Sequence, residues 1–192
     1  MDLALRYPLA VPGKNRYTDG ITLFTTDKGG SPMGRIDKEN YYLDIAQTVA
    51  ERSTCLRRRY GAILVKSDEI IATGYNGAPR GRQNCVDLNY CTREALNIPS
   101  GERYELCRSV HAEANAIISA ARRDTLGATL YMVCVAPETG ALIPGSTSCS
   151  MCRRLIINAG IRRVVIRDTP TEYRVVEVSD WVEEDDSLPP GR

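Results

Sequence analysis

The sequence lacks any apolar run near the ~20 residues that a transmembrane helix requires, so no membrane function is expected. It also lacks an excess of charge of either sign, because 25 basic and 24 acidic side chains leave a net charge of +1. That balance provides no overall field to attract nucleic acid or an anionic membrane. Histidine is also scarce: the 192 residues include only His111, so its role needs an explanation.

A secretory signal is not expected either, since MDLALRYPLAVPGK has no charged segment followed by a continuous apolar stretch. We therefore expect a cytoplasmic protein with one globular domain, for which this length is sufficient. Seven cysteines are present, at positions 55, 85, 91, 107, 134, 149 and 152. Because their number is odd and the cytosol is reducing, metal binding or plain burial is expected rather than a disulfide framework.

Hydrophobic periodicity predicts helices and strands that alternate along most of the chain. A loop-like arm (1–38) rich in turn-forming residues is predicted to precede a single domain (39–184) and a tail (185–192). We expect helices at 39–53, 111–123 and 149–160, strands at 61–66, 70–75, 128–135, 161–167 and 172–184, and an irregular cysteine-containing insertion at 76–110. This alternation predicts a three-layer α/β domain, with helices on both faces of a sheet.

Two short motifs, each at the start of a predicted helix, carry the candidate chemistry. His111 and Glu113 open one helix, and Cys149 and Cys152 open another. One imidazole and two thiolates provide three zinc ligands and leave a fourth position for water, and a helix N-terminus favours thiolates. Glu113 could reach that water without binding the metal. Each motif alone has a simpler interpretation: an incidental histidine, a redox pair or a purely structural zinc site.

An H-x-E motif followed by C-x-x-C is the signature of zinc nucleobase deaminases. With several further segments, the chain resembles the cytidine and deoxycytidylate deaminase superfamily and is most similar to its deoxycytidylate (dCMP) deaminase branch. The resemblance is carried by RSTC (52–55), YGAILV (60–65), GYNGAPRG (74–81), SGERYELC (100–107), HAEANAI (111–117), GATLY (127–131) and CSMCRRLIINAGIRRVV (149–165). It implies a three-layer α-β-α cytidine deaminase-like fold with a mixed central sheet.

The resemblance also implies a zinc-dependent hydrolase that converts dCMP to dUMP and ammonia. The catalytic zinc would be held by His111, Cys149 and Cys152, while Glu113 moves protons between water and the pyrimidine. By the same resemblance the protein is expected to be a homo-oligomer, either a dimer or a hexamer, that binds a small nucleotide.

A second, structural zinc is a further implication of the resemblance. Bacterial and phage relatives place its ligands at positions similar to Cys55, Cys85, Cys91 and Cys107, and four thiolates can close a tetrahedral shell around an irregular insertion. The alternative is a set of buried free thiols. Cys134, in the middle of a predicted strand, is expected to be a core residue.

Three residues are candidates for substrate contacts. Asn76 matches a position that contacts the sugar in relatives, although it could instead be a turn residue that favours left-handed backbone. Asn115, one helical turn after His111, could support the site or be purely structural. A nucleotide phosphate needs a cationic partner, for which Arg80 is the candidate, unless it is simply a solvated surface residue.

Ser148 departs from the family pattern, because relatives have proline immediately before the first cysteine of C-x-x-C. A serine there is expected to cap the following helix instead. The loop at 136–148 is also longer than in relatives and is expected to cover the substrate.

Two other functions stay open at this point. The first is a deaminase of bases in tRNA or single-stranded DNA, which the balanced charge disfavours. The second is a non-catalytic regulatory or competence protein of the same superfamily, which the intact Glu113 disfavours.

Overall fold

Helices and strands alternate along residues 34–99 and 101–184, the part of the chain that this computed structural model describes. The predicted tail (185–192) and residues 1–33 of the predicted arm lie outside these residues. In chain order the elements are α1 (Lys38–Ala50), β1 (Arg59–Lys66), β2 (Glu69–Tyr75), α2 (Cys85–Leu88), α3 (Thr92–Ala95), the 3-10 turn η1 (Tyr104–Leu106), α4 (Ala112–Ile118), α5 (Arg122–Thr125), β3 (Thr129–Val135), α6 (Ser150–Asn158), β4 (Arg163–Arg167), β5 (Tyr173–Glu177) and α7 (Val178–Glu183). None of the described helices is long and apolar enough to cross a membrane.

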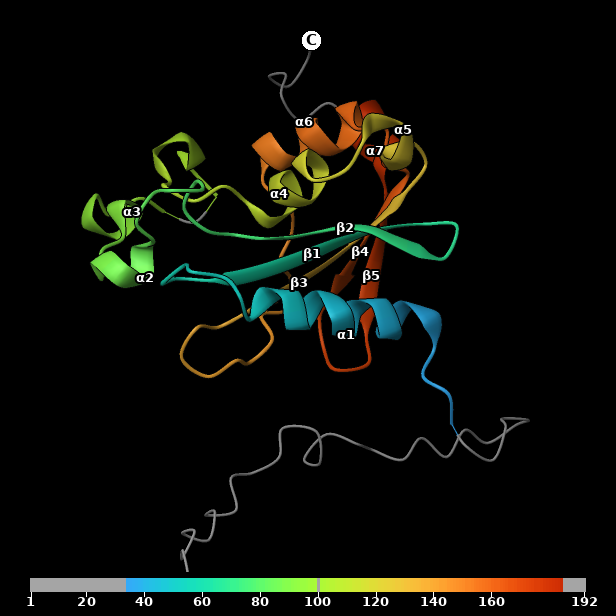
Figure 1. Cartoon of the computed structure of the whole chain (residues 1–192), viewed down its shortest axis with the longest axis horizontal. Coiled ribbons are helices and arrows are strands. Elements are labelled where there is room, and N and C mark those ends of the chain that lie inside the picture. The colour runs from blue at the N-terminus through green and yellow to red at the C-terminus, as the bar shows by residue number, and fades with distance from the viewer. Residues whose placement is uncertain (1–33, 100, 185–192) are drawn as a thin grey trace, which may run out of the picture. The chain divides into compact units, whose positions relative to one another are not determined.

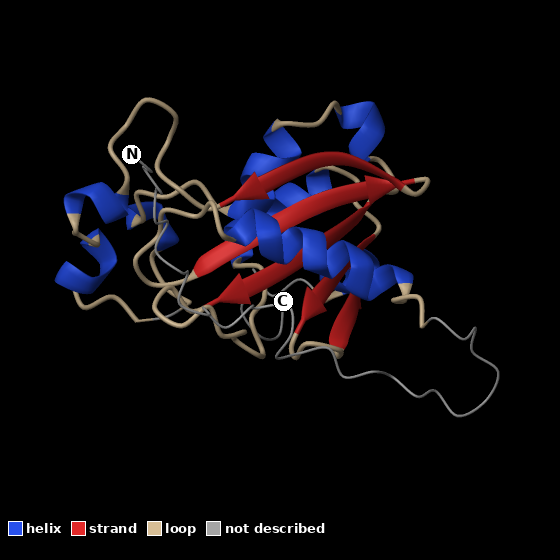
Figure 2. Ribbon diagram, turned by 60° about the horizontal axis from the view of Figure 1, so that its bottom comes forward, coloured by secondary structure: helices blue, strands red, loops and turns tan. Residues whose placement is uncertain are grey.

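The strands form one mixed sheet in the order β2-β1-β3-β4-β5. The β3–β4 pair is parallel and the other three pairs are antiparallel. Helix α1 covers one face of the sheet, whereas α4 and α6 lie over the other (Figure 1, Figure 2). The predicted three-layer α/β fold with a mixed sheet is therefore confirmed.

Strand β1 is buried on both faces, which explains its nearly continuous run of apolar residues. Ile63 and Val65 pack with Leu43 and Ala46 of α1 in one core cluster. Ala62 and Leu64 face the opposite way and pack in a second cluster with α4 and α6. Because successive side chains of a strand point to opposite faces, one apolar strand serves both cores.

Two glycines let helices approach the sheet unusually closely. A Cβ built on Gly61 would lie 2.0 Å from the Ala46 carbonyl oxygen of α1. One built on Gly74, in the GYNG segment, would lie 2.2 Å from the Ala112 carbonyl oxygen of α4. Backbone leaves no room for a methyl group at either position, so Gly74 fixes the position of the helix that follows His111.

Two predicted elements were wrong in their extent. The helix predicted at 111–123 is two helices, because α4 ends at Ile118 and Ala121 has extended backbone (φ −77°, ψ 144°) before α5. Thr125 ties α5 to the end of α6 through a 2.7 Å hydrogen bond from its Oγ1 to the Ala159 carbonyl oxygen. Tertiary contacts thus override the high helix propensity of this segment.

The strand predicted at 172–184 ends at Glu177, and its second half is α7. The helical turn places Val178 in the core cluster on the α4–α6 side of the sheet and packs Trp181 against that cluster.

Replacing each of the two tightly packed glycines by alanine gives a matched test. Both Gly61→Ala and Gly74→Ala are expected to lower the free energy of unfolding in urea by about 1–3 kcal/mol, since both overpack a helix–sheet contact. Only Gly74→Ala is also expected to weaken zinc binding, because it displaces α4. Equal zinc affinity in the two variants would show that the position of α4 is not critical.

Candidate active site

The topology of the sheet brings the two predicted motifs to the same edge. Strands β2 and β3 are both antiparallel to β1, so their carboxyl ends lie at one edge of the sheet. The chain leaves β2 into the insertion and returns through a bridge between Gly77 and Val110, next to His111. His111 then begins α4, and Cys149, after the loop that follows β3, begins α6.

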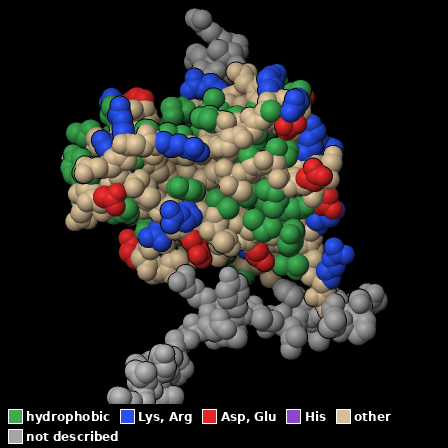
Figure 3. Space-filling view, viewed as in Figure 1, with side chains coloured by type: hydrophobic (Ala, Val, Ile, Leu, Met, Phe, Trp, Pro, Cys, Tyr) green, Lys and Arg blue, Asp and Glu red, His purple; other side chains and the backbone are tan. Residues whose placement is uncertain are grey.

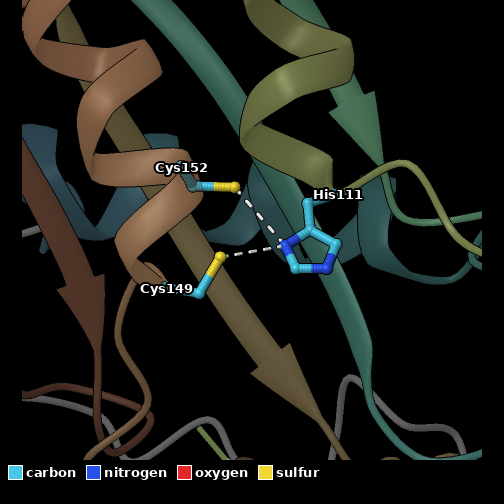
Figure 4. Close-up of side chains that lie close together, drawn as sticks. All are labelled: His111, Cys149 and Cys152. Atoms are coloured by element: carbon cyan, nitrogen blue, oxygen red, sulfur yellow. Dashed lines mark hydrogen bonds between the residues drawn. The ribbon is translucent and has the colours of Figure 1, made fainter. Parts of the chain in front are cut away.

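The three predicted zinc ligands converge where α4 and α6 begin (Figure 4). His111 Nδ1 lies 3.4 Å from the Sγ atoms of both Cys149 and Cys152. Zinc bonds of about 2.3 Å to sulfur and 2.0–2.1 Å to nitrogen, at tetrahedral angles, would place nitrogen and sulfur roughly 3.6 Å apart. The donor atoms and their spacing therefore fit a zinc ion with one position left open.

The side chains of His111, Cys149 and Cys152 shift one another's pKa values through hydrogen bonds. Burial opposes a charge on His111, but hydrogen bonds with Cys107 and Cys149 raise the pKa of His111 to about 10. A hydrogen bond from Cys152 lowers the pKa of Cys149 to about 4, and the same bond raises the pKa of Cys152. Zinc requires a neutral imidazole and two thiolates, so its binding displaces protons from these atoms.

Glu113 lies beside the candidate ligands and is almost fully buried, with 3 % of its surface exposed. Burial raises the pKa of this carboxyl group, although the neighbouring His111 charge and a hydrogen bond with Ser148 oppose the shift. The carboxyl group also forms a hydrogen bond with the Cys152 thiol. A carboxyl group with a raised pKa, next to the open position of a metal site, is suited to accept and return protons.

A cavity opens in front of these groups. Its wall includes His111, Glu113 and Cys149 together with residues of the insertion. The other lining residues are Cys55, Arg57, Arg58, Tyr60, Asn76, Arg93, Tyr104, Cys107, Ser109, Ala112 and Thr147. A small polar molecule in this cavity would therefore contact the candidate metal site and several arginines together.

A model of the family described as the cytidine and deoxycytidylate deaminase zinc-binding region matches residues 36–168. The chain belongs to this family. The match includes both motifs and the insertion between them, so it confirms the resemblance seen in the sequence.

Individual relatives agree with this membership. The chain is 38% identical over 138 residues to the deoxycytidylate deaminase of Mycobacterium phage D29, covering 69% of this chain and 96% of that protein. It is 34% identical over 127 residues to the deoxycytidylate deaminase of Schizosaccharomyces pombe, covering 66% of this chain but only 36% of that protein. A solved structure of the cyanophage S-TIM5 dCMP deaminase, in complex with dCMP and dUMP, is 26% identical, with 69% of this chain and 84% of that chain covered and a TM-score of 0.47.

In this deaminase-family chain, Asn76 lines the cavity, but its amide is engaged by the protein. Its Oδ1 accepts hydrogen bonds from Ser53 Oγ and from the Tyr60 backbone nitrogen (2.8 Å), and its Nδ2 donates to the Arg58 carbonyl oxygen (2.9 Å). Asn76 is absent from the described residues with positive φ, so the left-handed turn interpretation was wrong. Its amide therefore holds the segment that leads into β1, which includes the cavity arginines Arg57 and Arg58.

The other two candidate substrate residues lie outside the cavity wall. Arg80 is exposed on the loop after β2, so the surface interpretation describes its position. Asn115 donates from Nδ2 to the Tyr75 carbonyl oxygen at 2.7 Å and thereby ties α4 to the end of β2. The arginines that do line the cavity are Arg57, Arg58 and Arg93. Arg93 is buried, and no sequence motif distinguishes it from the other arginines of the chain.

Ser148 does not cap α6, contrary to expectation. Cys149 is the N-cap residue, and the helix has no side-chain cap hydrogen bond. The Ser148 side chain is instead buried and forms a hydrogen bond with Glu113, while its carbonyl oxygen accepts from Arg153 Nε at 3.2 Å. Of the long loop at 136–148, Thr147 reaches the cavity wall.

The four cysteines predicted to hold a second zinc lie near one another without forming a metal-ligand cluster. Burial raises the pKa of the Cys85 thiol, and the charges of Cys55, Cys107 and Cys91 raise it further. Within the described ranges, however, only His111, Cys149 and Cys152 bring their ligand atoms within 4.8 Å of one another. Cys107 forms a hydrogen bond with His111 instead. The second zinc therefore stays a prediction.

Two equally buried cysteines provide a test of the candidate ligands. Cys152→Ala is expected to remove one zinc per chain, measured by mass spectrometry of the metal content, because it deletes a ligand of the three-residue set. Cys134→Ala, on β3, is the matched control and is expected to leave the zinc content unchanged. Loss of zinc from both variants, or from neither, would contradict the ligand assignment.

Proposed function

We propose that this protein catalyses the hydrolytic deamination of dCMP, giving dUMP and ammonia. The observation that carries the proposal is the convergence of His111, Cys149 and Cys152 with the buried Glu113 on one cavity. Membership of a zinc-binding deaminase family supports the chemistry. The alignment with almost the whole deoxycytidylate deaminase of phage D29 supports the choice of dCMP.

His111, Cys149 and Cys152 would hold the catalytic zinc. When bound, zinc supplies a Lewis acid that makes water a nucleophile near neutral pH. Glu113 accepts a proton as the water oxygen bonds to C4 of the cytosine ring, and it delivers that proton to N3. It then passes the second proton of the water to the exocyclic amine, so that the C4–N bond breaks and ammonia leaves.

The surroundings of Glu113 suit this sequence of proton transfers. Its burial keeps bulk water away from the carboxyl group and brings its pKa towards the range in which it can both accept and donate. The hydrogen bonds with Ser148 and Cys152 hold the carboxyl group beside the ligand set. The arginines that line the cavity favour an anionic substrate.

A nucleic-acid substrate is less well supported. Basic and acidic side chains are interspersed over the face shown in Figure 3, without a continuous basic stripe. The net charge of +1 points the same way. A mononucleotide fits this distribution better, because it needs only local positive charge inside the cavity.

A second zinc in the insertion is part of the proposal. Cys55, Cys85, Cys91 and Cys107 offer four thiols of the kind that structural zinc uses, and the first three belong to segments that contact one another. A hydrogen bond from the Val86 nitrogen to the Thr54 carbonyl oxygen (3.3 Å) joins two of these segments. A homo-oligomer, which the resemblance implies, and a cytoplasmic location, which the sequence analysis favours, are further elements of the proposal.

Glu113→Gln tests the proposed catalytic role. Ammonia release from dCMP is expected in the zinc-loaded wild type, and kcat is expected to fall about 10²- to 10⁴-fold in the variant, whose zinc content should not change. Glu105→Gln, which alters an exposed carboxylate of the insertion paired with Arg103, is the control and should retain activity close to wild type. Absence of ammonia release from dCMP, CMP, their nucleosides and triphosphates would refute the function.

Cys85→Ser tests the second zinc. The wild type is expected to bind two zinc ions per chain and the variant one, because Cys85 lies among the other three cysteines of the insertion. The melting temperature should also fall, since structural zinc contributes directly to folding. One zinc per chain in both proteins would mean that these thiols are simply buried.

A further inference from the structure

One cavity arginine differs from the other two because two of its buried donor atoms have no partner. Arg57 forms an ion pair with Glu94 (Nε to Oε1, 3.4 Å), and Arg58 forms a hydrogen bond with Tyr60. Arg93 takes part in no ion pair among the described residues, although only 3 % of its surface is exposed. Its Nε and Nη1 atoms are buried without hydrogen-bond partners.

A buried guanidinium with unsatisfied donors is unfavourable unless something compensates it. The Glu105 carboxylate pairs with Arg103 (2.8 Å) and interacts with Arg93 only through its charge, so it accepts no hydrogen bond from the unpartnered Arg93 atoms. Arg93 is one of the residues of the cavity wall that also contains His111 and Glu113. The missing partner is therefore expected to be an anionic group that enters the cavity.

The surrounding residues hold Arg93 in place for such a partner. Its Nη2 donates to the Pro99 carbonyl oxygen at 2.6 Å, and its Cζ stacks 4.2 Å from the centroid of the Tyr104 ring. Tyr104 also contacts His111 edge-to-face, at 5.2 Å between ring centroids. Both contacts share the Tyr104 ring, so the distance from the Arg93 Cζ to the His111 ring cannot exceed the sum of these two distances. A single nucleotide is long enough to span such a distance.

From this arrangement we propose that Arg93 binds the 5′-phosphate of the substrate and makes the enzyme selective for a nucleotide over a nucleoside. The guanidinium keeps its positive charge and has N–H donors without partners, which can form charge-assisted hydrogen bonds with a phosphate. With the phosphate at Arg93, the pyrimidine extends past Tyr104 towards His111 and Glu113. The inference rests on the proposed function, and it gives the insertion, which lies beyond the ends of β1 and β2 (Figure 1, Figure 2), a role in specificity.

Binding to the Arg93→Gln variant tests the inference without depending on turnover. Calorimetry is done in the Glu113→Gln background, so that ligands are not consumed, with dCMP and deoxycytidine as probes. Arg93→Gln is expected to raise the Kd for dCMP about 10- to 100-fold, as for loss of hydrogen bonds to a charged group. The Kd for deoxycytidine, which has no phosphate, should change little.

Arg103→Gln is the matched control, because it removes the same charge from the same insertion but outside the cavity wall. It is expected to leave both affinities close to those of the parent protein. Arg93→Lys keeps the charge and the apolar stem but loses the planar fork. It should show a smaller loss that is still specific for dCMP, and it provides the test if Arg93→Gln does not fold.

Three results would overturn the inference: an equal loss for both probes, no loss for dCMP, or an equal loss in Arg103→Gln. Turnover by the protein with an intact Glu113 separates this inference from the proposed function. If that protein deaminates dCMP and Arg93→Gln keeps its preference for dCMP over deoxycytidine, only the role of Arg93 fails. If it deaminates no cytosine compound, the proposed function fails, and the binding data still decide whether Arg93 recognises phosphate.

Discussion

The contact between the start of α4 and the start of α6 is the constraint on which the rest of the site depends. The sheet order places the carboxyl ends of β2 and β3 at one edge. His111 and Cys149, which are 38 positions apart in the sequence, therefore come into contact. Gly74 lets α4 lie against β2 without an intervening methyl group. The site is therefore assembled by the most buried part of the fold, and a change of register there would separate the ligands.

Another part of the cavity wall comes from a different kind of structure. The insertion between β2 and α4 contains two short helices and a 3-10 turn, and it depends on polar contacts and cysteines more than on an apolar core. This division is physically sensible, because the metal ligands and Glu113 need a fixed geometry. Substrate preference can then vary through loops without disturbing that geometry.

Much of this could be predicted from the sequence, and the exceptions share a cause. Strong periodicity located the strands, and the H-x-E and C-x-x-C motifs identified the residues that the structure brings together around His111. The break at Ala121 and the turn into α7 escaped prediction, because tertiary contacts of Thr125 and Trp181 decide them. Arg80 was chosen by its nearness to a motif, whereas Arg93 is selected by burial and missing partners, which only coordinates reveal.

The central claim is that one imidazole and two sulfurs share a single zinc ion in front of Glu113. A crystal grown with zinc, with diffraction recorded on both sides of the zinc absorption edge, tests it most directly. The account predicts an anomalous peak about 2.3 Å from the Sγ atoms of Cys149 and Cys152 and about 2.0–2.1 Å from His111 Nδ1, with its open side towards Glu113. Anomalous density only elsewhere, with His111 and the two sulfurs bound to no ion, would contradict it.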